Sequence, residues 1–153
     1  MTLEALYQEI ILEHNRKPRN YRVMADANRK VEGNNPLCGD QLTLWVKVDG
    51  ETVADVSFQG VGCAISKASA SLMTAAVKGK SVIEARALAE HMHDLVTGKL
   101  DVDAEREALG ALAALGGVSK FPIRVKCASL PWHALKSALD DTNAAAVVST
   151  EPA

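Results

Sequence analysis

The residues best suited to chemistry in this sequence are its three cysteines, Cys38, Cys63 and Cys127. They lie 25 positions apart (38 to 63) and then 64 (63 to 127), so no pair forms the local knuckle of a zinc finger. A free cysteine is most often a small buried apolar residue, but a thiolate can also bind metal or act as a nucleophile. The predicted position of each cysteine in the secondary structure therefore distinguishes between these interpretations.

Cys38 is expected on a loop. Residues 19–37 are rich in Asn, Asp and Arg and predict irregular structure that leads into Asn35-Pro36-Leu37-Cys38-Gly39-Asp40. Asp40 stands two positions after Cys38 across a glycine, so both side chains could turn onto one ion if the loop bends. The alternative for Asp40 is an ordinary turn or capping aspartate.

Cys63 is expected at the turn between a strand and a helix. Apolar and polar residues alternate over 42–48 and again over 53–58, and Asp49-Gly50 between them is a strong hairpin signal. Two glycines just before Cys63 permit unusual backbone angles, and the small-residue run that follows predicts a helix closed by Gly79.

Cys127 is expected at or just before the N-terminus of the last helix. Pro131 has no N–H, so we place it in the first turn of that helix, where the missing donor does no harm. A helix N-terminus stabilises a thiolate, and Arg124 and Lys126 add positive charge nearby. Either a reactive thiolate or a metal ligand fits this position.

The remaining pattern predicts an α+β domain, with a small antiparallel sheet packed against several helices and the metal site at one end. Helices are expected over 3–17, 81–98 and 103–115, the second opening with a capping box of Ser81 and Glu84. We expect one domain over 1–140 and a flexible C-terminal tail over 141–153.

The composition argues against several classes of function. The 153 residues carry a formal net charge of −2 with Lys and Arg scattered, which disfavours nucleic-acid binding. The start lacks the continuous apolar region of a signal peptide, and no apolar run approaches the roughly 18 residues that a membrane span needs. We therefore expect a cytoplasmic protein with no membrane partner, in which disulfides are disfavoured.

Three separate motifs give the sequence a specific resemblance. The strings NPLCGD (35–40), GVGCAISKASAS (60–71) and SKFPIRVKCASLPWHAL (119–135), preceded by LYQEIILEHNRKPRNY (6–21), resemble the SufU proteins, which are relatives of IscU and of the NifU N-terminal domain. The similarity runs from about residue 3 to 139. It implies a zinc ion bound by Cys38, Asp40, Cys63 and Cys127.

Two departures from the IscU pattern favour SufU. Lys126 stands where IscU-type scaffolds have a histidine beside the third cysteine, and a lysine cation is a poor ligand. The segment 99–117 also resembles the insertion that distinguishes SufU chains. His133 is not expected to replace the missing ligand, because six helical positions from Cys127 turn its side chain by about 600° and move it by about 9 Å. For the other histidines, His14, His91 and His93, solvated or lightly paired side chains are expected.

The resemblance implies that a pyridoxal-phosphate-dependent cysteine desulfurase of the SufS type forms a persulfide, and that Cys38 accepts its terminal sulfur for the iron–sulfur assembly machinery. Arg124 would help to dock or orient the desulfurase; the alternative is an ordinary solvated surface arginine. The chain would then be a sulfurtransferase that also stimulates the desulfurase. Two alternatives use the same residues: a scaffold that holds iron or a transient [2Fe–2S] cluster, and a module whose zinc is structural and which activates the desulfurase by contact.

Overall fold

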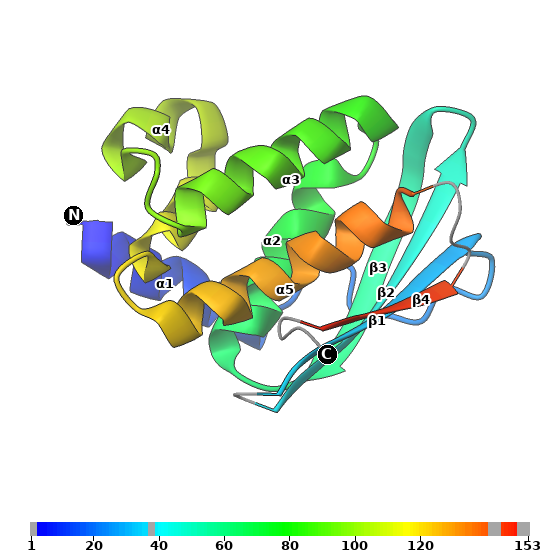
Figure 1. Ribbon diagram of the computed structural model, residues 1–153, viewed down its shortest axis with the longest axis horizontal. Helices are drawn as coiled ribbons and strands as arrows, with labels where there is room; N and C mark the ends of the chain where they lie inside the picture. The colour runs from blue at the N-terminus through cyan, green and yellow to red at the C-terminus, as the bar shows by residue number, and fades with distance from the viewer. Residues whose placement is uncertain (1–2, 37–38, 141–144, 150–153) are drawn as a thin grey trace.

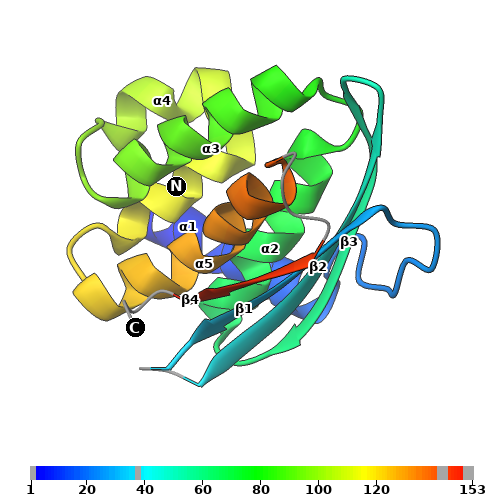
Figure 2. The same ribbon diagram turned by 45° about the vertical axis from the view of Figure 1, so that its right-hand side comes forward.

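The computed structural model describes residues 3–36, 39–140 and 145–149, which form a twisted sheet with helices packed on one face (Figures 1 and 2). The α+β prediction is therefore confirmed. In chain order the elements are α1 (Leu3–Arg16), β1 (Arg29–Asn35), β2 (Asp40–Asp49), β3 (Thr52–Val61), α2 (Ala64–Val77), α3 (Val82–Val96), α4 (Val102–Leu109), the 3₁₀ helix η1 (Gly110–Val118), α5 (Pro122–Ala138) and β4 (Ala145–Ser149).

The sheet has the order β3-β2-β1-β4, and its first three strands are antiparallel. The predicted hairpin is present as β2 and β3, with Leu44 opposite Phe58. Strand β1 lies in the stretch that the sequence analysis predicted to be irregular. Val31 is its only large apolar residue, and β1 forms because its backbone pairs with β2 along its whole length, as far as Asn35 opposite Asp40.

Strand β4 adds a parallel neighbour to β1, with pairs running from Lys30 and Ala145 to Asn34 and Ser149. The sequence predicts no regular structure after residue 141, so the strand over 145–149 differs from that expectation. Its backbone bonds to the edge of β1, and such a long-range pairing leaves no periodic signal in a five-residue segment. The domain boundary at residue 140 stays a prediction.

The core lies between the inner face of the sheet and the helices α2 and α5, which contact it directly. Four large side chains of the core have at most 1% of their surface exposed. They are Leu44 and Phe58 from the sheet, Met73 from α2 and Leu135 from α5. Helix α2 is rich in small buried residues, among them Ser69, so its backbone can come close to α5.

Helix α3 begins with the predicted capping box, because the Ser81 hydroxyl accepts the Glu84 N–H and the Glu84 carboxylate accepts the Ser81 N–H. The helix predicted over 103–115 is instead split into α4 and η1. Gly110 at the junction has a φ of +57°, which ends the α-helical turn.

The predicted start of the last helix is wrong. Helix α5 begins at Pro122, in its first position, after the extended residue Phe121 (φ −125°, ψ 93°), and Pro131 lies inside the helix. Pro131 has no N–H to donate to the carbonyl of Cys127, four residues earlier. Its burial in the packed middle of α5 offsets that cost. Cys127 is consequently in the second turn of α5 rather than at its N-terminus.

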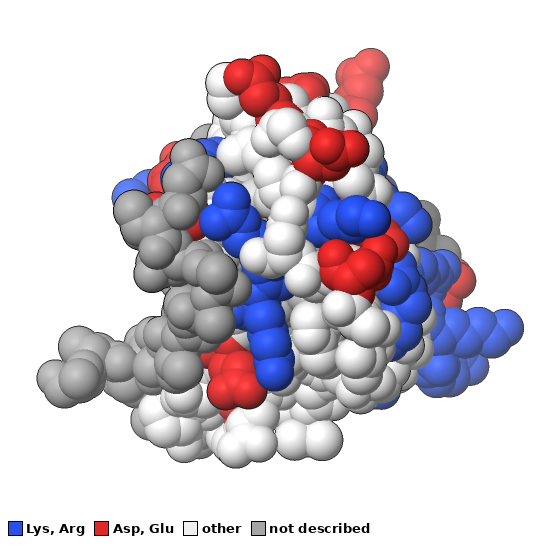
Figure 3. Space-filling view, turned by 90° about the vertical axis from the view of Figure 1, so that its right-hand side faces the viewer, with Lys and Arg blue, Asp and Glu red and all other residues white. Residues whose placement is uncertain are grey.

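The surface carries both signs of charge. On the face shown in Figure 3, Lys and Arg side chains lie next to Asp and Glu side chains. Surface ion pairs of the protein include Arg22 with Asp55 (2.7 Å) and Lys47 with Asp26 (3.0 Å). Among the described residues, no helix has both the length and the apolar character that crossing a membrane requires.

Candidate metal centre

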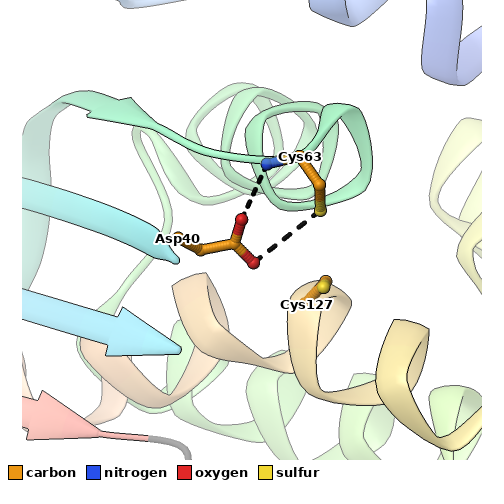
Figure 4. A group of neighbouring side chains, drawn as sticks. All are labelled: Asp40, Cys63 and Cys127. Atoms are coloured by element: carbon orange, nitrogen blue, oxygen red, sulfur yellow. Dashed lines mark hydrogen bonds between the residues drawn. The ribbon is translucent and has the colours of Figure 1, made fainter. Parts of the chain in front are cut away.

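Three predicted ligands converge at one end of the sheet (Figure 4). Asp40 is the first residue of β2, Cys63 lies between β3 and α2, and Cys127 lies on α5. One carboxylate oxygen and the two sulfurs all lie within 4.8 Å of one another. Cys38, the fourth predicted ligand, is outside the described residues.

A bidentate contact fixes Asp40 against Cys63. The Cys63 N–H donates to Asp40 Oδ1 at 2.7 Å, and Cys63 Sγ lies 3.7 Å from Asp40 Oδ2. Gly62 makes this approach possible, because its φ is +139° and a Cβ on it would lie 2.7 Å from the Asp40 Cα atom and closer still to Oδ1. A residue with a side chain would collide with Asp40 at position 62, so glycine is required there.

Cys63 caps the N-terminus of α2. Its backbone is extended (φ −74°, ψ 158°) and its sulfur accepts the N–H of Ser66 at 3.5 Å. The partial positive charge of a helix N-terminus, which the sequence analysis predicted for Cys127, therefore acts on Cys63 instead.

A buried polar link holds α5 in place beside Cys63. The Ser69 hydroxyl on α2 donates to the carbonyl of Ala128 at 2.7 Å and accepts the indole N–H of Trp132 at 3.1 Å. Ala128 directly follows Cys127, so this link fixes the register of Cys127 against α2. Cys127 itself is only 2% exposed.

The geometry of this donor set fits a zinc-like ion. A tetrahedral zinc site separates a thiolate sulfur from a carboxylate oxygen by about 3.5 Å. The 3.7 Å between Cys63 Sγ and Asp40 Oδ2 is close to that value. Asp40 and Cys127 are buried as well, and buried anions require a cation or strong donors nearby. These three residues could therefore hold a metal ion, with soft sulfur ligands that favour zinc or iron over magnesium or calcium.

Asn35 is a residue of this centre that the sequence analysis did not identify. Its amide nitrogen lies 3.2 Å from Asp40 Oδ2 and 3.4 Å from Cys127 Sγ, and its side chain is fully buried. The only sequence signal for Asn35 was its position three residues before Cys38, in a stretch that was predicted to be irregular.

The histidines lie in other surroundings. His133 faces His93, with ring centroids 6.1 Å apart, on the contact between α5 and α3. His91 pairs with Glu105 at 2.8 Å. His14 is buried, and its Nδ1 lies 2.7 Å from the Ser71 hydroxyl.

Arg124, the predicted partner-binding residue, is exposed one turn before Cys127, and its guanidinium lies 4.6 Å from the ring centroid of Phe121. It lines a hollow of about 450 Å³ that also includes Tyr7. Burial raises the pKa of Tyr7, the nearby Arg124 lowers it, and the negative charges of Cys63 and Cys127 raise it further. A cationic side chain and a phenol thus lie next to the cysteine cluster.

Comparison with known proteins gives a consistent family. Residues 6–128 match the family described as NifU-like N terminal domain. The zinc-dependent sulfurtransferase SufU of Bacillus subtilis (strain 168) is 46% identical over 134 residues, covering 88% of this chain and 89% of the relative. The iron–sulfur cluster assembly scaffold protein IscU of Streptococcus pyogenes serotype M1 is 44% identical over 137 residues, covering 90% of this chain and 84% of the relative.

A solved structure agrees with these sequence matches. A proposed iron–sulfur cluster assembly scaffold protein for the SUF system, from Fervidobacterium islandicum AW-1, superposes with a TM-score of 0.80 at 34% identity. The match covers 89% of this chain and 98% of that one. The chain therefore belongs to the NifU-like N-terminal domain family, together with the SufU and IscU proteins.

Proposed function

We propose that this protein is a zinc-dependent sulfur acceptor that takes persulfide sulfur from a cysteine desulfurase and passes it on for iron–sulfur cluster assembly. The observation that carries the proposal is the convergence of Asp40, Cys63 and Cys127, in a chain 46% identical to a relative named as a zinc-dependent sulfurtransferase. In this proposal Cys38, Asp40, Cys63 and Cys127 bind the ion.

Cys38 is the proposed acceptor because Asn35 and Asp40, which lie on either side of it in the sequence, are both at the cysteine cluster. Asn35 and Asp40 are paired at the end of the β1–β2 ladder, so the segment between them leaves and re-enters the sheet at the metal centre. Cys63 and Cys127, by contrast, are built into the start of α2 and the body of α5. Releasing either of them would disturb a helix, which disfavours both as the acceptor.

The transfer is a thiol–persulfide exchange. The thiolate of Cys38 attacks the terminal sulfur of the desulfurase persulfide, a new S–S bond forms at Cys38, and the desulfurase cysteine leaves as a thiolate. The exchange needs no external oxidant or reductant. A bound zinc ion would keep the cysteine thiols deprotonated at neutral pH. Asp40, Cys63 and Cys127 would hold that ion while Cys38 reacts.

Arg124 is proposed to bind the desulfurase. It is exposed, carries a fixed positive charge, and is one helical turn from Cys127. No acidic residue occurs between Ser119 and Leu139, so the charged side chains that this segment itself contributes are all cationic. An acidic group of the desulfurase would find its complement here.

A scaffold for a [2Fe–2S] cluster is the second candidate, favoured by the 44% identity to a relative named as an IscU scaffold. Three cysteines and an aspartate can bind iron as well as zinc. Lys126 argues against it, since the residue beside Cys127 is a cation and adds no ligand.

The test combines metal analysis with sulfur mapping. We expect about one zinc per colourless chain. After incubation with a cysteine desulfurase and cysteine, mass spectrometry should find one added sulfur on Cys38. Cys38→Ser should stay folded and still bind the desulfurase, but should neither acquire the sulfur nor raise desulfurase turnover.

Each other outcome selects a rival. A brown protein with about two irons per chain supports the scaffold. Normal stimulation by Cys38→Ser supports activation by contact, and unfolding of Cys38→Ser supports a structural zinc. Sulfur found on Cys63 or Cys127 contradicts the assignment of Cys38.

A further inference from the structure

A single buried amide contacts two of the three described ligands. Asn35 ends β1 with 0% of its surface exposed, and its Nδ2 lies 3.2 Å from Asp40 Oδ2 and 3.4 Å from Cys127 Sγ. An amide nitrogen carries two hydrogens, so it can donate to both atoms at once. Its two acceptors come from different elements, β2 and α5.

The chemistry of the acceptors fixes the orientation of the amide. If the amide were turned over, its carbonyl oxygen would face the carboxylate oxygen of Asp40, and two acceptors would repel each other without a proton between them. With the nitrogen inward, each hydrogen faces a group that is anionic when it binds metal. Donation to an anion gives a stronger hydrogen bond than donation to a neutral group.

We infer that Asn35 is a positioning residue of the metal centre: it holds Asp40 and Cys127 in place as the permanent ligands. This inference rests on the metal-binding part of the proposed function. An N–H bond to a thiolate sulfur withdraws electron density from it, so Asn35 makes Cys127 a poorer nucleophile as well as a fixed ligand.

The two ligand contacts of Asn35 join three elements of the fold. They connect the end of β1 to the start of β2 through Asp40 and to α5 through Cys127. Both contacts act directly on ligand atoms, so Asn35 fixes Asp40 and Cys127 relative to each other.

Substitution of Asn35 by Leu tests this role, because leucine has a similar size and no donor. Asn35→Ala is the second variant, and Asn34→Ala is the matched control, since Asn34 is the neighbouring amide on the opposite, partly exposed face of β1. Each protein is loaded with Zn²⁺, and zinc is withdrawn with a chromogenic chelator. A second sample is loaded with Co²⁺, and its thiolate-to-cobalt absorption is recorded.

We expect Asn35→Leu and Asn35→Ala to bind zinc about 10- to 100-fold more weakly than the wild type, the usual effect of removing a partner of a metal ligand. Their thiolate-to-cobalt band should shift, because the sulfur of Cys127 has lost a hydrogen-bond donor. Asn34→Ala should match the wild type in both measurements. Circular dichroism establishes that the variants compared are folded.

The outcomes separate this inference from the proposed function. If the wild type binds zinc and both Asn35 variants retain its affinity and its cobalt spectrum, the role of Asn35 is disproved and the metal centre stands. If the wild type binds neither Zn²⁺ nor Co²⁺, the metal-binding part of the proposed function fails and the inference fails with it. Weaker binding in Asn34→Ala equal to that in Asn35→Leu would also overturn it, since the effect would then not depend on the buried donor.

Discussion

The carboxylate of Asp40 touches Cys63 twice: Oδ1 accepts the Cys63 backbone N–H at 2.7 Å, and Oδ2 lies 3.7 Å from the Cys63 sulfur. One oxygen thus fixes the start of α2, while the other faces the space between the two cysteines (Figure 4). The structural and the ligand roles of this carboxylate are carried by different atoms, and substitutions can separate them.

We predict that Asp40→Asn and Asp40→Ala both weaken zinc binding, because each removes the anionic oxygen ligand. Only Asp40→Asn keeps an oxygen that can accept the Cys63 N–H. Asp40→Ala should therefore also lower the stability of the metal-free protein, by about 1–3 kcal/mol for the unpaired N–H. Chelator competition measures the first effect and urea unfolding the second. Unchanged zinc affinity in Asp40→Asn would remove Asp40 from the ligand set.

Gly62→Ala should destabilise the protein and weaken metal binding together. The added Cβ would meet Asp40, and a φ of +139° is strained for alanine. Gly79→Ala is the matched control: its φ is +86°, but a Cβ there has no atom within 4 Å. It should cost about 1 kcal/mol of stability from backbone strain and leave zinc affinity unchanged. Equal zinc affinities for the two variants would show that the approach of Gly62 to Asp40 is not required.

Arg124→Ala should weaken binding of the desulfurase by about tenfold, the equivalent of one charge-assisted hydrogen bond of about 1.5 kcal/mol. Zinc content should not change, because Arg124 is exposed and outside the cluster. Arg106→Ala serves as the control, since Arg106 lies on α4 and pairs with Asp103. Titration of each variant with the desulfurase at low salt measures its affinity for the desulfurase. Equal affinity of the two variants would reject the docking role.

The stability of the metal-free protein should fall as the pH is lowered below 6.5, the ordinary pKa of histidine. Burial, with a smaller contribution from Arg19, lowers the pKa of His14, so the unfolded chain takes up a proton that the folded chain does not. His14→Gln should reduce this slope and leave a remainder, because burial also lowers the pKa of His133. Urea unfolding at several pH values measures this pH dependence of the free energy of unfolding. At pH 8, where both histidines are neutral, the histidine contribution should vanish, and an unchanged slope in His14→Gln would contradict the assignment.

The parts of the fold that local signals determine could be predicted from the sequence. Asp49-Gly50 specified the β2–β3 hairpin, Ser81 and Glu84 specified the start of α3, and the glycine before Cys63 marked the turn into α2. Each depends on residues within a few positions of one another. The convergence of Asp40, Cys63 and Cys127 was predicted from the resemblance, since their spacing alone says little.

The parts that depend on distant contacts could not be predicted. Pro131 lies in the buried middle of α5, where packing against other elements compensates for its missing N–H, whereas a local rule places proline at a helix start. Asn35 gains its partners through β2 and α5, which are separate in sequence. The same holds for β1 and β4, whose residues carry too little apolar periodicity to predict a strand.

The separation of the three described ligands along the chain has a consequence for the order of events during folding. Asp40 and Cys63 are joined by a local hairpin, but Cys127 arrives only with α5. A growing chain can thus present a partial site, which lacks Cys127, before the last helix has been synthesised, and the complete site exists only when α5 docks. A bound ion stabilises only that docked state, so withdrawal of the metal should loosen α5 before it affects the hairpin.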